Sequence, residues 1–153
     1  MEIEKIAHHA ELGGRWLTEQ LSDNGDWKVD EGFNLDAYYK APWALAQTGN
    51  SREAQLILNH IQENFLNSTG DLEPVSSNVL REVQHLYANF YVLHASMMTS
   101  RYEVGFPIGE FIDKRMRPDG SFSSEKNKTI ENSGTSTMST SAGGLAALAL
   151  GDT

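Results

Sequence analysis

Three helix-like runs of this chain end in the same short turn. Each turn consists of a glycine, one polar residue and one large apolar residue: Gly25-Asp26-Trp27, Gly70-Asp71-Leu72 and Gly120-Ser121-Phe122. Eleven residues before each closing apolar residue stands another large apolar residue, namely Trp16, Ile61 and Phe111. The turn glycines lie 45 and 50 residues apart, and repeats at this spacing indicate one supersecondary unit copied along the chain. Because a single unit cannot bury its own apolar face, the copies must stack or close into a ring.

Composition narrows the classes of protein that this chain can belong to. Its 153 residues fit one domain, its net charge is −9, and it contains no cysteine. The acidity argues against a nucleic-acid or membrane surface, since both need clustered Lys and Arg. The lack of cysteine excludes disulfides, thiolate zinc sites and Cys nucleophiles. No apolar run resembles a signal peptide, so we expect a soluble, cytoplasmic protein without nucleic-acid or membrane partners.

Apolar periodicity predicts six helices and no sheet. The expected helices cover residues 3–21, 35–48, about 51–65, 78–98, 105–116 and 142–150, with Pro107 in the first turn of the fifth. The first, third and fifth are amphipathic, whereas the second, fourth and sixth are apolar around more of their circumference. This alternation is typical of an outer and an inner ring of helices. The expected hairpins are residues 1–48, 50–98 and 102–150, all within one domain spanning 1–153.

The first copy of the repeat is the most specific. Trp16 and Gln20 on a helix, followed by Gly25-Asp26-Trp27, resemble the aromatic repeat of the terpenoid cyclase and protein prenyltransferase superfamily. The glutamine stands one residue early, and the other two copies keep only Gly-x-apolar and the preceding bulky residue. The resemblance implies an all-α fold of helical hairpin repeats, an (α/α) toroid. Six hairpins complete such a toroid and three are present here. We therefore expect either a homodimer that closes the ring or the N-terminal half of a longer protein.

The resemblance carries over no catalytic motif. The aspartate-rich acid motif of the class II cyclases is absent, because Asp36-Ala37 does not supply it, and the prenyltransferase zinc site needs a cysteine. His8 and His9 are adjacent, so they lack the spacing of metal ligands. Phosphate loops, nucleophile elbows and dinucleotide fingerprints are also missing from the sequence. We expect no metal and no cofactor.

Polar and aromatic residues gather where the inner helices are expected to begin. In toroids of this class, the mouth of the central cavity lies at that end. The resemblance therefore places there three candidate catalytic residues, His85, Asp36 and Tyr39, and five candidate substrate-binding residues, Arg81, Lys40, Trp43, Glu82 and Thr137. His85 would transfer protons, with Asp36 or Tyr39 orienting it. Arg81, one helical turn away, would bind a carboxylate.

Two of these assignments leave alternatives open. Tyr39 and Trp43, one turn apart, either line a pocket or fill the core. The hydroxyl-rich run around Thr137 either caps the sixth helix or binds a ligand. We also expect the repeat residues to be buried between hairpins: Trp16, Trp27, Ile61, Phe111 and Phe122.

Three functions fit this pattern. The leading hypothesis is an enzyme of cyclase, isomerase or lyase type, which uses acid–base chemistry on a small organic molecule in the central cavity. The second is a carbohydrate-active toroid, either an epimerase or a glycan hydrolase or lyase. In that case Tyr39 and Trp43 would stack on sugar rings, and Asp36 and Glu82 would transfer protons. The third is a non-enzymatic scaffold whose repeat surface binds a partner.

Overall fold

The computed structural model of the chain describes residues 3–28, 34–73, 85–123, 132 and 134–151. Within these ranges it contains six α-helices, one short 3-10 helix and no strand, so the predicted all-α class is confirmed. The elements are α1 (Ile3–Gln20), the 3-10 helix η1 (Leu35–Ala37), α2 (Ala41–Gln47), α3 (Ser51–Asn64), α5 (His85–Met98), α6 (Tyr102–Asp113) and α7 (Thr137–Leu150). None of the described helices is long and apolar enough to cross a bilayer.

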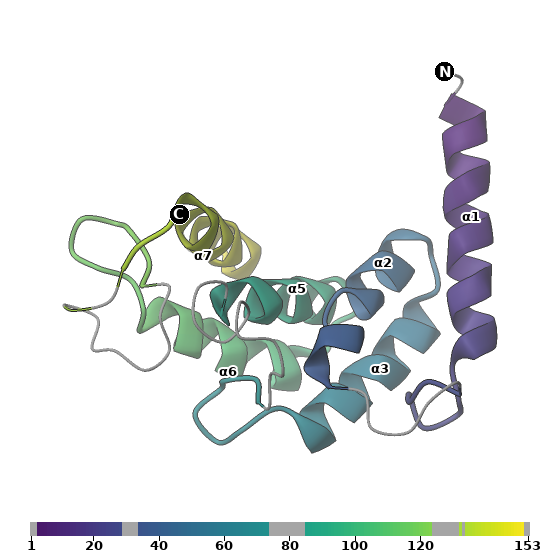
Figure 1. Cartoon of the computed structure of the whole chain (residues 1–153), viewed down its shortest axis with the longest axis horizontal. Coiled ribbons are helices and arrows are strands. Elements are labelled where there is room, and N and C mark those ends of the chain that lie inside the picture. Colours follow the sequence, from purple (N-terminus) through teal and green to yellow (C-terminus); the bar gives the residue numbers. More distant parts are fainter. Residues whose placement is uncertain (1–2, 29–33, 74–84, 124–131, 133, 152–153) are drawn as a thin grey trace.

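Helices α2, α5 and α7 pack in a row, with α5 in the middle. Helix α3 packs against α2 and α5, and α6 packs against α5 and α7 (Figure 1). The core lies between the row and these two helices, where Leu45, Leu58, Leu93 and Ile108 are completely buried. Each Å² of apolar surface removed from water stabilises the fold by about 25 cal/mol. This core is therefore the main source of stability.

Helix α1 stands at one end of the molecule, opposite α7 (Figure 1). In its C-terminal half, Gly14 allows close approach of the link between α2 and α3. A Cβ at this position would lie 2.8 Å from the amide nitrogen of the Asn50 side chain. The N-terminal half of α1 projects past the body, and Ile3 and Ile6 are exposed there.

The three turns noted in the sequence share one backbone structure. In each turn, an isolated antiparallel bridge joins the first residue to the last. The bridged pairs are Leu21 with Trp27, Leu66 with Leu72, and Met116 with Phe122. Inside each bridge, a backbone N–H donates to a carbonyl four residues later, at distances of 2.8, 2.9 and 2.8 Å. The glycines have φ angles of 82°, 85° and 80°, a region that glycine enters without the steric cost of a Cβ. The sequence repeat therefore corresponds to a repeated turn geometry.

Three helices differ from their predicted bounds, one of them being α7, which begins at Thr137 rather than at residue 142. Residues 78–84 of the fourth expected helix lie outside the described residues. The expected helix over 35–48 is split into η1 and α2, because a continuous helix would need an N–H at Pro42 to bond to the Tyr38 carbonyl. The expected fifth helix begins earlier, at Tyr102, and ends at Asp113. Pro107 therefore lies inside α6, and its predicted place in the first turn is wrong. The turn before Pro107 contains Val104, which is completely buried, and this burial favours an early helix start.

The expected burial of the repeat residues holds for only some of them. Ile61 and Phe122 are buried, which confirms the prediction for these two, whereas Trp27 and Phe111 are half-buried. The prediction for Trp16 is wrong, because 61% of its surface is exposed. The reason is tertiary: no described segment covers the face of α1 on which Trp16 lies.

Candidate functional site

Four aromatic residues and one lysine form a cluster where α2 packs against α5. We call this set, comprising Tyr39, Lys40, Trp43, Tyr87 and Tyr91, the tyrosine–lysine cluster. Its aromatic rings meet edge to face. The ring centroids are 5.3 Å apart for Trp43 and Tyr91, 6.1 Å for Tyr39 and Tyr87, and 6.0 Å for Tyr39 and Tyr91. These separations lie in the favourable range for aromatic pairs.

Lys40 places its ammonium group over three of these rings. The Nζ atom lies 5.4, 5.2 and 5.8 Å from the ring centroids of Tyr39, Tyr87 and Tyr91. Each distance is within the range of a cation–π interaction. Partial burial acts to lower the pKa of Lys40, but hydrogen bonds and charge attraction from Tyr39 and Tyr87 outweigh it and raise the pKa. The cluster therefore holds a fixed positive charge.

The two tyrosines of α5 are made unequal by their surroundings. Their hydroxyl oxygens are 3.3 Å apart. The hydrogen bond with Tyr91, helped by the charge of Lys40, lowers the pKa of Tyr87 below its ordinary value of 10.0. The same hydrogen bond, together with burial, raises the pKa of Tyr91. Two titratable groups with pKa values pushed apart are the usual basis of acid–base assignments in enzymes, and Tyr87 is here the group that gives up its proton more readily.

Trp43 brings an unused hydrogen-bond donor to the cluster. Its indole Nε1 is buried and has no hydrogen-bond partner among the described residues. Buried polar atoms in native proteins are nearly always paired. An unpaired buried donor of this kind marks a candidate position for an oxygen atom of a bound molecule.

The structure brings together three of the eight residues expected from the sequence: Tyr39, Lys40 and Trp43. Asp36 lies in η1 and is half-buried. His85 is the first residue of α5 that the structure describes, and its side chain lies outside the description, as do Arg81 and Glu82. Thr137 begins α7 and is exposed. The cap of α7 is the neighbouring Ser136, whose hydroxyl accepts from the Ser139 N–H at 3.0 Å.

Tyr87 and Tyr91 are the functional candidates that sequence reasoning missed. They stand four residues apart, as do Tyr39 and Trp43. Residues at that spacing share one face of a helix. Two aromatic pairs of equal spacing, on the neighbouring helices expected over 35–48 and 78–98, were therefore the available signal.

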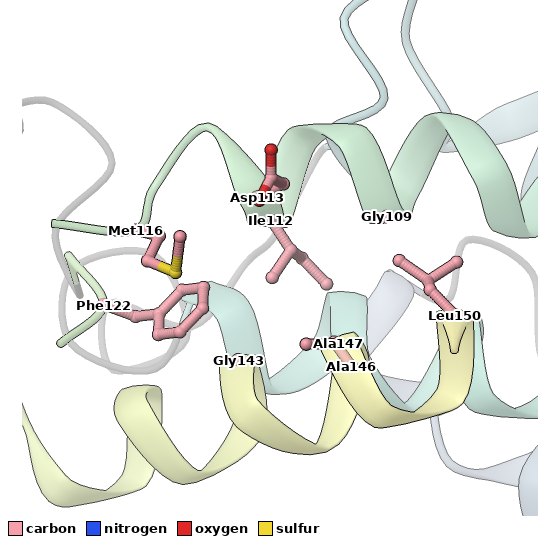
Figure 2. A pocket seen from close by; sticks show the side chains of 9 residues that line it. All are labelled: Gly109, Ile112, Asp113, Met116, Phe122, Gly143, Ala146, Ala147 and Leu150. Carbon is pink, nitrogen blue, oxygen red and sulfur yellow. The ribbon is translucent and has the colours of Figure 1, made fainter. Parts of the chain in front are cut away.

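A separate apolar groove lies between α6 and α7 (Figure 2). Its volume is about 360 Å³, and its lining residues are Gly109, Ile112, Asp113, Met116, Phe122, Gly143, Ala146, Ala147 and Leu150. The Phe122 ring occupies the space that a side chain at Gly143 would need. Asp113 is the only ionisable residue in this described lining, so the groove suits packing better than catalysis.

The described part of the chain contains no group of three His, Asp or Glu side chains that could bind a metal ion. Comparison of the chain with models of protein families, with curated proteins and with solved structures found no match. The function of the chain must therefore be inferred from the geometry of the cluster.

Proposed function

We propose that this chain is a small-molecule enzyme of the cyclase, isomerase or lyase type, which transfers protons at the tyrosine–lysine cluster. The observation that carries the proposal is the ammonium group of Lys40, which lies within 6 Å of three tyrosine rings. A cation in this position stabilises a phenolate and so favours proton transfer by a tyrosine. The catalytic residue we propose is Tyr87, in place of His85.

The roles follow from the geometry of each group. Tyr87 takes a proton from carbon as a phenolate, or gives one as a phenol, while Lys40 balances the charge that changes. Tyr91 orients the Tyr87 oxygen through their hydrogen bond. The indole N–H of Trp43 binds a substrate oxygen, and the ring of Tyr39 packs against apolar carbon. The substrate class is therefore an apolar molecule with one carbonyl group.

The proposed setting for this chemistry is an (α/α) toroid, with α2, α5 and α7 as its inner wall. Two observations support it. The three turns have equal geometry, and the three inner helices pack in a row with α3 and α6 on their outside. We propose that three helical hairpins of this kind form half of the ring.

Proton transfer can be tested without knowing the natural substrate. Cyclic enones and other apolar ketones are incubated with the protein in D₂O, and deuterium uptake at the carbon beside the carbonyl is followed by NMR. We expect the wild-type protein to catalyse exchange and Tyr87→Phe to lose about 10²- to 10⁴-fold in rate, the usual contribution of a general acid or base. Tyr102→Phe is the matched control, because Tyr102 is exposed on α6, away from the cluster. Equal rates for the two variants would exclude Tyr87 as the catalytic group.

A carbohydrate substrate is the second candidate, and the unpaired indole N–H of Trp43 is the observation that favours it. A tryptophan in a binding site offers both an apolar face and a donor for a hydroxyl oxygen. Monosaccharides and short glycans tested by NMR titration distinguish the two. Binding that depends on Trp43, without any exchange of ketone hydrogens, would favour the carbohydrate.

A further inference from the structure

The first two turns pack tightly against the outer helix that follows each of them. A Cβ at Gly25 would overlap the carbonyl group of Leu56 in α3. A Cβ at Gly70 would likewise overlap the carbonyl group of Pro107 in α6, and it would lie 3.2 Å from the Cβ of Phe111. The third turn has the same backbone conformation, yet a Cβ at Gly120 would meet no described atom within 4 Å.

Helix α6, against which the second turn packs, also covers the groove next to that turn. Gly105 of α6 packs closely against α5, because a Cβ at this position would lie 3.3 Å from the Cβ of Ser96. Ile108 of the same helix is completely buried. Arg101, at the start of α6, extends over α3 and donates to Gln62 at 3.1 Å. The equivalent groove beside the third turn is the one between α6 and α7, and its described lining comes from these two helices and the third turn, with no residue of a further helix.

Helix α1 has an apolar face against which no described turn packs. Counted from the turns, Leu12 and Trp16 stand in α1 where Ile57 and Ile61 stand in α3. The two residues of α3 are completely buried, and the backbone of Ile57 lies beside Gly25 of the first turn. Leu12 and Trp16 are 45% and 61% exposed. Helix α1 therefore has the face that receives a turn, and no described turn lies against it.

We propose that the third turn and the groove beside it receive helix α1 of a second copy of this chain. The two unfilled faces are halves of an interface that the molecule already forms twice within itself. Trp16 of one copy would then lie beside Gly120 of the other, as Phe111 lies beside Gly70. The faces lie at opposite ends of the molecule (Figure 1), so the contact is head to tail, and two copies are the smallest number that closes it. This inference does not depend on the proposed chemistry.

The mass in solution tests the proposal directly. Sedimentation of the wild-type chain over a range of concentrations should show twice the mass of the 17.0 kDa chain. Gly120→Ala and Trp16→Ala should each raise the dissociation constant by about 30-fold or more, as expected for residues central to an interface. Gly49→Ala is the control for Gly120→Ala. Gly49 also has a positive φ and no described atom within 4 Å of a Cβ, but it lies between α2 and α3. A monomer at all concentrations, or an assembly that both variants leave intact, would overturn the proposal.

Cross-linking tests the direction of the contact. Because the chain has no cysteine, Trp16→Cys and Gly120→Cys each carry a single thiol. A head-to-tail contact brings the thiol of the first variant to the thiol of the second. An oxidised mixture of the two variants should therefore form a covalent dimer, whereas each variant alone should not. A disulfide formed by either variant alone, or none in the mixture, would contradict the proposed interface. Both substitutions are at exposed positions, so the folded state should survive them.

Discussion

Replacing Gly70 with alanine should lower the free energy of unfolding by about 2–5 kcal/mol. Two effects add. A residue with a Cβ pays about 1–2 kcal/mol at the left-handed φ of 85°. The new methyl group would also overlap the Pro107 carbonyl group of α6, and overpacking of this kind costs about 1–3 kcal/mol. Urea denaturation followed by circular dichroism measures the loss.

Gly49→Ala separates these two effects. Gly49 has a φ of 82° and open space around a Cβ, so this variant should lose only the backbone cost of about 1–2 kcal/mol. The excess loss in Gly70→Ala then measures how tightly the second turn packs against α6. Equal losses in the two variants would show that the turn does not dock as described.

Tyr38→Ala should cost about 3–5 kcal/mol, as for other buried aromatic residues. Tyr38 is only 1% exposed and joins the first turn to the start of α2. Its ring centroid lies 4.7 Å from that of His60, 5.6 Å from Phe65 and 6.0 Å from Trp27. Its hydroxyl donates to the carboxylate of Asp26, and burial with this hydrogen bond raises its pKa above the ordinary value of 10.0.

Tyr38→Phe keeps the ring and removes only the hydroxyl. We expect it to lose about 1.5–3 kcal/mol near neutral pH, the range for a hydrogen bond to a charged group. Because the pKa of Tyr38 is raised in the folded state, the wild-type protein should lose stability as the pH rises above the unfolded value of 10.0. The phenylalanine variant should lack that part of the alkaline loss. Tyr102→Ala, at an exposed position, is the control for Tyr38→Ala, and thermal melts in which the two cost the same would contradict this role of Tyr38.

The helices could be predicted because their apolar residues recur at the helical period. The turns could be predicted because each one needs a glycine at a positive φ, and such positions stand out in a sequence. The exact bounds of each helix were harder to predict from the sequence. Pro42 divides the second expected helix, whereas Pro107 is tolerated inside α6, although buried residues precede both prolines.

The exposure of Trp16 and the composition of the site could not be predicted in the same way. Burial of Trp16 requires a second segment to cover it, and a repeat in the sequence shows only that equivalent residues are covered elsewhere. Lys40 and Tyr87 come together because α2 packs against α5, which is a tertiary relation. Tyr39, Lys40 and Trp43 were expected at a site because the resemblance to the toroids placed them where an inner helix was expected to begin. Their partners on α5 became evident only from the packing of the two helices.

The most direct test of the proposed site is the ionisation of its tyrosines. Protein labelled with ¹³C at the tyrosine ring carbon bearing oxygen is titrated by NMR, and Tyr87→Phe and Tyr91→Phe assign the two signals. The structure predicts that Tyr87 ionises below the ordinary value of 10.0 and Tyr91 above it. Lys40→Gln should raise the pKa of Tyr87, because the cation that stabilises its phenolate is gone. Ionisation of Tyr87 at or above the ordinary value, unchanged in Lys40→Gln, would contradict the assignment of Tyr87 as the proton-transfer group.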